Sequence, residues 1–272
     1  MNRRQLLRAT TALGAAGTLG GTAAGSVAAA DGSAGAAAGP VAAADASARP
    51  AAGPAAGPAV AAAETTRPLR VHVVMFDGVE ELDFAAPYEV FSAAAFFAPR
   101  PVDVRYVSAS GARTVTAAYG TIVRGIRPWA PDEADVLVVP GGGYARRDSP
   151  GVWAEIDRGT LPRALAAAVR PGLTVSALCT GVMLLSAAGL TRSRPCTTHH
   201  KAKPDLGQQG GLLKDARVVD DGDLVTAGGV TSGLELALWL VSRELGPDAA
   251  NSLETMLEYE ARGTVRTSPR AD

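Results

Sequence analysis

One cysteine stands where a chain can present a nucleophile. The apolar run 173–178 predicts a buried strand and 182–188 predicts a helix, so Cys179 falls at the turn between them. This is the strand–turn–helix setting of a nucleophile elbow, with cysteine in place of serine. The start of a helix favours the thiolate over the thiol. A small buried cysteine that only packs is the alternative.

A run of three glycines, 141–143, follows another predicted buried strand at 134–139. Glycine lets backbone N–H groups approach a ligand closely. The N–H groups of Gly142 and Gly143, with that of Thr180, are therefore candidates for an oxyanion hole beside Cys179. A flexible turn between strand and helix is the alternative for these glycines.

Acidic residues come directly after the first predicted strand, 69–76, and they include Glu80, Glu81 and Asp83. A carboxylate beside a thiol can accept or return its proton and so act as a general acid and base. The commoner use of such residues is to face solvent at the start of a helix. Both interpretations stay open from the residues alone.

His199 and His200 are adjacent, and a Cys179–His199 pair is one way to activate sulfur. Two neighbouring histidines can also bind metal. With three histidines in the chain and no other ligand at suitable spacing nearby, we expect no metal site.

The remaining pattern predicts the elements that position these residues. Strands are expected at 69–76, 102–107, 134–139 and 173–178, hairpins at 113–124 and 216–227, and helices at 87–94, 151–169 (broken around Pro162), 182–188, 232–245 and 249–259. Continuous apolar strands alternating with helices indicate a three-layer α/β sandwich with a mostly parallel sheet. Sites in such sheets lie beyond the carboxyl ends of the strands, where the candidate residues fall.

The N-terminal quarter has a different composition. Residues 1–30 combine Arg3 and Arg4 with a weakly apolar stretch and an alanine-rich end, which predicts a secretory signal of the twin-arginine type. Residues 31–66 are rich in Ala, Gly and Pro and predict a disordered linker. We expect the folded domain at 67–266 and a short tail at 267–272.

Composition narrows the function classes. The 272 residues carry a net charge of -1 with no basic block in the folded part, which argues against nucleic acid as a partner. Cys179 and Cys196 are too few for a disulfide scaffold. Pairing them with each other would consume the elbow sulfur, so we expect both to be free.

Six segments in register resemble the ThiJ/PfpI superfamily of class I glutamine amidotransferase-like domains. They are 76–91, 138–142, 179–181, 187–190, 197–199 and 226–233. The resemblance covers about residues 69–262, and it implies a flavodoxin-like fold with a cysteine elbow. Peptidase-like and chaperone-like branches carry His after the cysteine, whereas this chain has Thr180 and is similar to the isonitrile hydratase branch.

That branch implies roles for three residues. Cys179 would be the nucleophile that attacks the terminal carbon of an isonitrile, Asp83 the general acid and base, and Thr180 a positioning residue. Water would then release an N-substituted formamide, with no metal or organic cofactor. The resemblance also implies a homodimer. We therefore expect an exported enzyme acting on a small-molecule electrophile, without a membrane partner once the signal is cleaved.

Two alternatives remain. A glyoxalase-like or deglycase-like activity on α-oxoaldehydes needs a base near Cys179, and His199 is the candidate. A non-catalytic redox sensor or ligand-binding module needs only an oxidisable thiol.

Overall fold

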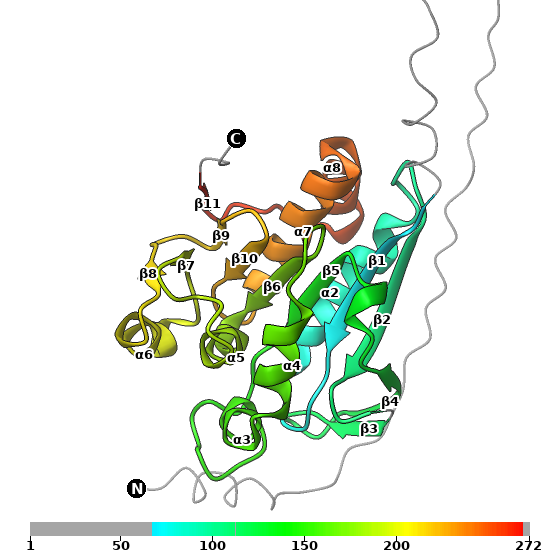
Figure 1. The fold of residues 1–272 in the computed structure, drawn as a ribbon. Helices are drawn as coiled ribbons and strands as arrows, with labels where there is room; N and C mark the ends of the chain where they lie inside the picture. Colours follow the sequence, from blue (N-terminus) through cyan, green and yellow to red (C-terminus); the bar gives the residue numbers. More distant parts are fainter. Residues whose placement is uncertain (1–66, 112, 269–272) are drawn as a thin grey trace, which may run out of the picture. The chain divides into compact units, whose positions relative to one another are not determined.

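One nine-stranded sheet organises the fold. The computed structural model describes residues 67–111 and 113–268. The strand order is β11-β9-β10-β6-β5-β1-β2-β4-β3, and all but two of the neighbouring pairs are parallel (Figure 1). The antiparallel pairs are β10–β9 and β3–β4, which are the two hairpins predicted from the sequence. The predicted fold class is thereby confirmed.

The elements run through the chain in an alternating order. The strands are β1 Leu69–Val74, β2 Val102–Ser108, β3 Arg113–Thr116, β4 Ile122–Pro128, β5 Val136–Val139, β6 Thr174–Leu178, β7 Pro195–Cys196, β8 Leu212–Leu213, β9 Val218–Asp220, β10 Leu224–Ala227 and β11 Val265–Thr267. The helices are α2 Glu81–Ala94, α3 Val152–Arg158, α4 Thr160–Ala168, α5 Val182–Ala187, α6 Lys203–Gln208, α7 Ser232–Leu245 and α8 Pro247–Leu257. Short 3₁₀ turns η2, η3 and η4 cover Pro131–Glu133, Cys179–Gly181 and His200–Ala202.

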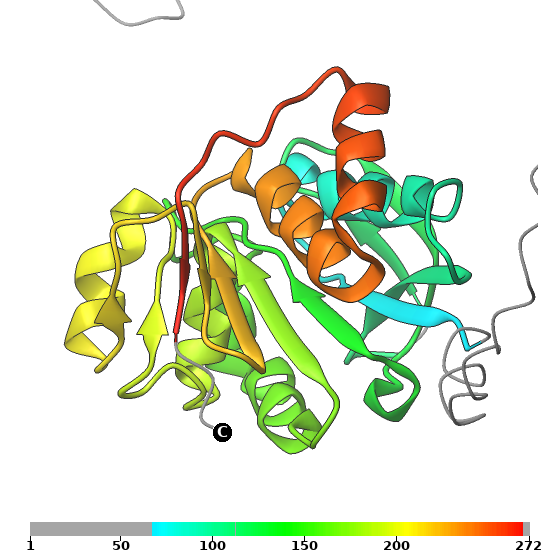
Figure 2. The same ribbon diagram turned by 90° about the horizontal axis from the view of Figure 1, so that it is seen from above.

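The helices form two layers. Helices α2, α7 and α8 contact one another on one face of the sheet, and α3, α4 and α5 contact one another on the other face (Figure 2). The central strands β5 and β6 are therefore covered on both sides. Every residue of β5 is buried, and so are all but the first of β6. This double burial explains why these strands are apolar throughout.

Helix α2 begins earlier than the sequence predicts. Pro87 was expected in the first turn of a helix at 87–94, but the helix starts at Glu81 and Pro87 lies inside it. A proline there provides no N–H for the carbonyl of Asp83, four residues earlier. The helix forms nonetheless because residues on both sides of Pro87, including Phe84 and Phe91, are buried in the core. As a result Asp83 lies in the first turn of α2.

The 151–169 segment breaks at a different residue from the one predicted. Gly159, with φ of +71°, separates α3 from α4, and Pro162 lies in the first turn of α4. Proline is tolerated in a first turn because its missing N–H has no partner there anyway. The two predicted helical pieces are present, but the break comes at Gly159 and not at Pro162 itself.

Some expectations fall outside the described residues. The predicted signal at 1–30 and linker at 31–66 both do, and so do residues 269–272 of the tail. Strand β11 pairs with β9, so the described chain is ordered in the sheet as far as Thr267. Within 67–111 and 113–268, no helix is both long enough and apolar enough to cross a bilayer.

The elbow depends on a close approach at Gly181. A Cβ there would lie 2.3 Å from the carbonyl oxygen of Val139 and 2.4 Å from that of Pro140. We expect Gly181→Ala to lower the free energy of unfolding by about 2 kcal/mol or more, because backbone must move to make room. Gly207→Ala is the matched control, since its Cβ would meet only the side chain of Leu213 at 3.3 Å. Equal urea midpoints for the two variants would refute the close-packing explanation.

Candidate active site

Cys179 is held in a strained backbone conformation. Its φ is +53°, which is uncommon for a residue with a side chain. Its N–H donates to the carbonyl of Gly228 at 2.6 Å, and its carbonyl accepts from the Thr198 hydroxyl at 2.7 Å. Strain of this kind persists only where surrounding contacts impose it, and it gathers at functional sites. The structure therefore shows the sharp turn that the sequence predicted.

Asp83 reaches the same point from α2. Its side chain is fully buried, and Oδ2 accepts a hydrogen bond from the Gly141 N–H at 2.8 Å. Oδ1 has no hydrogen-bond partner of good geometry among the described residues. Burial raises the pKa of Asp83 to about 7, while the Gly141 N–H and the Cys179 thiol oppose that rise. Near neutral pH this carboxyl can therefore both accept and donate a proton.

The thiol beside it is harder to ionise than the sequence suggested. Burial and, secondly, the charge of Asp83 raise the pKa of Cys179 to about 12. Hydrogen bonds from the backbone N–H groups of Val230 and Thr180 pull in the other direction but do not prevail. The N–H of Thr180 at the start of the turn does favour the thiolate, as the sequence predicted, but burial and the charge of Asp83 outweigh it. At rest the sulfur keeps its proton, and Asp83 is the group placed to take it.

The backbone N–H groups predicted for the oxyanion hole differ in whether they are free to donate to a ligand. The Gly142 N–H donates to the Thr180 hydroxyl at 3.0 Å, so that donor is already engaged, contrary to the role predicted for it. The Gly143 N–H has no acceptor among the described residues, and Gly143 borders the cavity. Sequence reasoning missed Val230, whose N–H faces the sulfur and whose φ is +39°. Only its place after Gly228 and Gly229 hinted at a special backbone.

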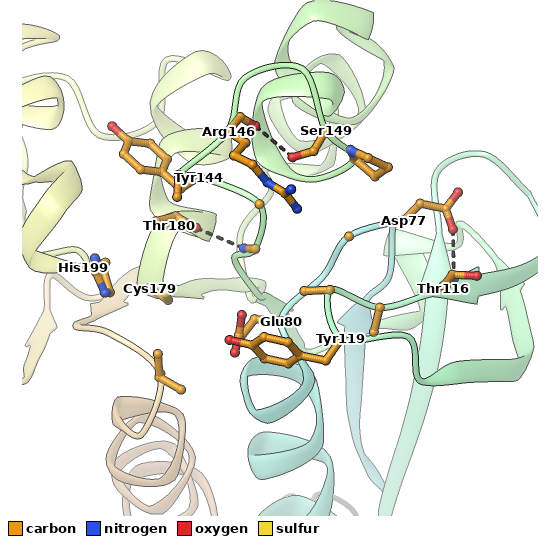
Figure 3. Close-up of a pocket in the computed structure, with 18 of the residues that line it drawn as sticks. Asp77, Glu80, Thr116, Tyr119, Tyr144, Arg146, Ser149, Cys179, Thr180 and His199 are labelled. Atoms are coloured by element: carbon orange, nitrogen blue, oxygen red, sulfur yellow. Dashed lines mark hydrogen bonds between the residues drawn. The ribbon is translucent and has the colours of Figure 1, made fainter. Parts of the chain in front are cut away.

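A cavity of about 710 Å³ opens over the sulfur (Figure 3). Cys179 and Thr180 lie on one side, with His199 beside them, and Glu80 and Tyr119 lie opposite (Figure 3). The loop carrying Tyr144, Arg146, Ser149 and Pro150 forms a further wall. This volume suits a small organic molecule.

His199 borders the cavity, but its ring is not placed to act as a base for the Cys179 thiol. Its Nδ1 accepts the Lys201 N–H at 3.2 Å, and its ring lies 4.2 Å from that of His200. Burial, then the neighbouring His200 and Lys201, lower the pKa of His199, so the ring is neutral at pH 7. With Nδ1 accepting, the ring proton sits on Nε2. His199 is therefore a hydrogen-bond donor in this geometry, which differs from the base that a Cys–His pair requires.

Glu80 and Glu81, the two other acidic residues in this segment, have different roles. Glu81 accepts from the Tyr119 and Thr121 N–H groups at 2.9 and 3.3 Å and so ties the β3–β4 hairpin to α2. Glu80 borders the cavity, where burial raises its pKa and a hydrogen bond from the Tyr119 hydroxyl lowers it. Tyr119 was not predicted for the site, because its position at the tip of a hairpin carries no sequence signal.

Over 67–111 and 113–268, no three His, Cys, Asp or Glu side chains gather closely enough to hold a metal ion. Cys179 and Cys196 are both free and both buried.

Comparison with known proteins assigns the chain to a family. The model of the DJ-1/PfpI family matches residues 69–243. The isonitrile hydratase of Pseudomonas putida is 32% identical over 211 residues, covering 75% of this chain and 86% of that protein. The glutathione-independent glyoxalase DJ-1 of Schizosaccharomyces pombe is 24% identical over 196 residues, covering 68% and 96%. A ThiJ/PfpI family structure from Pseudomonas syringae has a TM-score of 0.64 at 23% identity, covering 77% and 83%. The chain belongs to the DJ-1/PfpI family, as its motifs indicated.

Proposed function

We propose that the protein is a cysteine-dependent hydratase that converts an isonitrile to an N-substituted formamide. The observation that carries the proposal is the contact between the Cys179 thiol, which lines the cavity, and the fully buried Asp83 carboxyl. Hydration of an isonitrile requires a nucleophile and a proton at the same carbon, and this pair holds both. Similarity to the Pseudomonas putida isonitrile hydratase supports the choice of substrate.

In the first step, proton transfer from the thiol is coupled to attack of the sulfur on the substrate, because the thiol at rest holds its proton more tightly than Asp83 does. Asp83 accepts the proton of Cys179, and the sulfur adds to the terminal carbon of R–N≡C, forming the C–S bond. The N–H groups of Val230 and Thr180 stabilise the transient negative charge on sulfur. Asp83 then returns the proton to that carbon, which gives the thioformimidate R–N=CH–S–Cys179.

The second step consumes one water. Its oxygen bonds to the same carbon and one of its protons passes to nitrogen, giving R–NH–CH(OH)–S–Cys179. Asp83 takes the hydroxyl proton as the C–S bond breaks, the formamide R–NH–CHO leaves, and sulfur regains its proton. One carboxyl with a pKa of about 7 serves in both directions, because it holds either protonation state near neutral pH.

The α-oxoaldehyde alternative has weaker support in this geometry. It relied on His199 as a base, but Nδ1 of His199 already accepts the Lys201 N–H. The relative that carries the glyoxalase name is 24% identical to the chain. Turnover of methylglyoxal that is lost in His199→Ala would reverse this ranking.

The pH profile of isonitrile hydration tests the proposal. The productive state has one proton on the pair, so protonating Asp83 removes the base that the thiol requires. We expect kcat/KM to fall about tenfold per pH unit below about 7 and to level off above pH 8, since the thiol pKa of about 12 lies far higher. Formamide production followed by NMR between pH 5 and 9 measures this. A rate that rises on acidification, or no formamide from any alkyl isonitrile, would contradict the proposal.

Export and assembly stay predictions. Arg3 and Arg4 with the alanine-rich stretch behind them support export by the twin-arginine route, and the family resemblance supports a homodimer. Fractionation of cells carrying the wild-type or the Arg3→Lys, Arg4→Lys chain tests the first. Light scattering of the purified protein tests the second.

A further inference from the structure

Two cations border the cavity and lack acidic partners. Arg146 and Lys201 both contribute to its lining. Neither forms an ion pair with any Asp or Glu of the described chain, whereas most of the other arginines there do. A cation left unpaired at the mouth of a cavity is available to an anionic ligand.

Backbone contacts fix where Arg146 stands. Its N–H donates to the Gly143 carbonyl at 3.3 Å, and its own carbonyl accepts from the Ser149 hydroxyl at 2.9 Å. Its guanidinium points from the loop toward the centre of the cavity (Figure 3). The adjacent Arg147 behaves differently, because its guanidinium carbon lies 3.8 Å from the centroid of the Trp153 ring. One arginine of this loop is thus used in packing and the other is directed at the site.

Lys201 is fixed in a similar way. Its N–H donates to Nδ1 of His199, which borders the same cavity. The backbone of both residues is therefore held by hydrogen bonds, while their charged ends have no acidic partner among residues 67–111 and 113–268. Because the backbone beneath both side chains is already held, ordering on binding a ligand is confined to the side chains themselves.

The acids of the cavity do not cancel these charges. Asp77 is engaged by Arg113 and by the Thr116 N–H. Glu80 accepts from the Tyr119 hydroxyl, and burial raises its pKa. Asp77 and Glu80 are the acidic residues that line the cavity. Since neither forms an ion pair with Arg146 or Lys201, these two cations favour a negatively charged substituent on the ligand.

We propose that the preferred substrate carries a carboxylate, which Arg146 and Lys201 bind while the reactive carbon lies at Cys179. The inference rests on the proposed function for the reacting group, and it names the substituent that the cavity selects. The class is therefore a small isonitrile bearing a carboxylate on its R group. Guanidinium binds carboxylate through two parallel hydrogen bonds, which would also orient the molecule.

The test compares isocyanoacetate with its methyl ester, which differs by one negative charge. We expect the kcat/KM of the wild-type protein to be roughly 10 times higher, or more, for the acid than for the ester. A hydrogen bond to a charged group contributes enough binding free energy for a difference of this size. Arg146→Gln should lower the ratio about tenfold, whereas Arg147→Gln should leave it as in the wild type. The ratio should also fall as salt rises, since the pair is solvent-accessible. A wild-type ratio of one or below, or a preference for an isonitrile bearing a dimethylammonium group, would overturn the inference.

A binding measurement keeps the inference separate from the chemistry. Calorimetry on Cys179→Ser compares N-formylglycine, the product of the acid, with N-formylglycine methyl ester. Tighter binding of the acid, lost in the double variant with Arg146→Gln, supports the carboxylate site even if neither isonitrile is turned over. Ester turnover together with equal binding of the two formamides would retain the hydratase and reject the carboxylate site.

Discussion

Replacing Cys179 with alanine abolishes formamide production in our account, with a fall in kcat on the order of 10⁴-fold or more. The reason is that Cys179 is the thiol that lines the cavity, and the covalent adduct forms on its sulfur. Asp83 is fully buried and its carboxyl interacts with the thiol, and the N–H groups of Val230 and Thr180 contact the sulfur. Formamide formation measured by NMR over hours, with circular dichroism to establish folding, detects a loss of this size.

Cys196→Ala provides a matched control. Cys196 is also free and fully buried, and burial raises its pKa to about 11. It does not border the cavity. Deleting its sulfur removes a comparable volume from the core, so any general effect of losing a buried thiol appears in both variants. Comparable activity in Cys179→Ala and Cys196→Ala would show that the elbow sulfur does not carry the reaction.

Asp83→Asn is expected to have the second largest effect, a loss of about 10²- to 10⁴-fold in kcat/KM. Asparagine keeps an oxygen for the Gly141 N–H, so the change removes proton transfer while preserving that contact. The residual rate should lose its dependence on pH near 7, because the titrating group is gone. A variant that keeps the wild-type pH profile would assign that profile to another group.

Asp83→Asn should also raise the stability of the folded protein, by an amount that depends on pH. Folding raises the pKa of Asp83 from 3.8 to about 7, so between these values the folded state binds more protons than the unfolded state. Stability attributable to Asp83 therefore falls as pH rises through that window and is lowest above about 7. Asp83→Asn lacks this loss and should melt at a higher temperature than the wild type at pH 8, with a smaller difference at pH 5. A lower melting temperature at pH 8 would contradict the raised pKa.

The sequence correctly predicted that Asp83 and Cys179 meet, because their meeting depends only on the order and direction of the strands that precede them. Asp83 follows β1 and Cys179 follows β6, and both strands run in parallel with β5 between them. Their carboxyl ends therefore meet at one edge of the sheet, whatever the local detail. The fold class follows from the same alternation of apolar strands and helices.

The thiol's proton affinity was not predictable in that way. The expectation of a thiolate used only local information, the start of a helix after Cys179. The opposing effects, burial and the charge of Asp83, come from tertiary packing between residues far apart in sequence. The Val230 donor was missed for the same reason, since it reaches the sulfur from the loop after β10. The N–H of Thr180 in the 3₁₀ turn lowers the pKa of the thiol, but burial and the charge of Asp83 outweigh it.

Helix boundaries failed where proline was given too much weight. Pro87 lies inside α2 and Pro162 inside α4. In α2, burial of flanking side chains outweighs the cost of an internal proline, whereas Pro162 lies in the first turn of α4, where proline is tolerated. Gly159 ends α3 because its left-handed conformation suits glycine.

Mass spectrometry of the wild-type protein during turnover is the most direct test of the central claim, covalent catalysis by the Cys179–Asp83 pair. Samples quenched within the first turnovers with excess isonitrile should contain protein heavier by the mass of one intact isonitrile. The peptide containing Cys179 should carry that mass, and the peptide containing Cys196 should not. Formamide production with no adduct at any quench time, or an adduct on a different residue, would contradict the account.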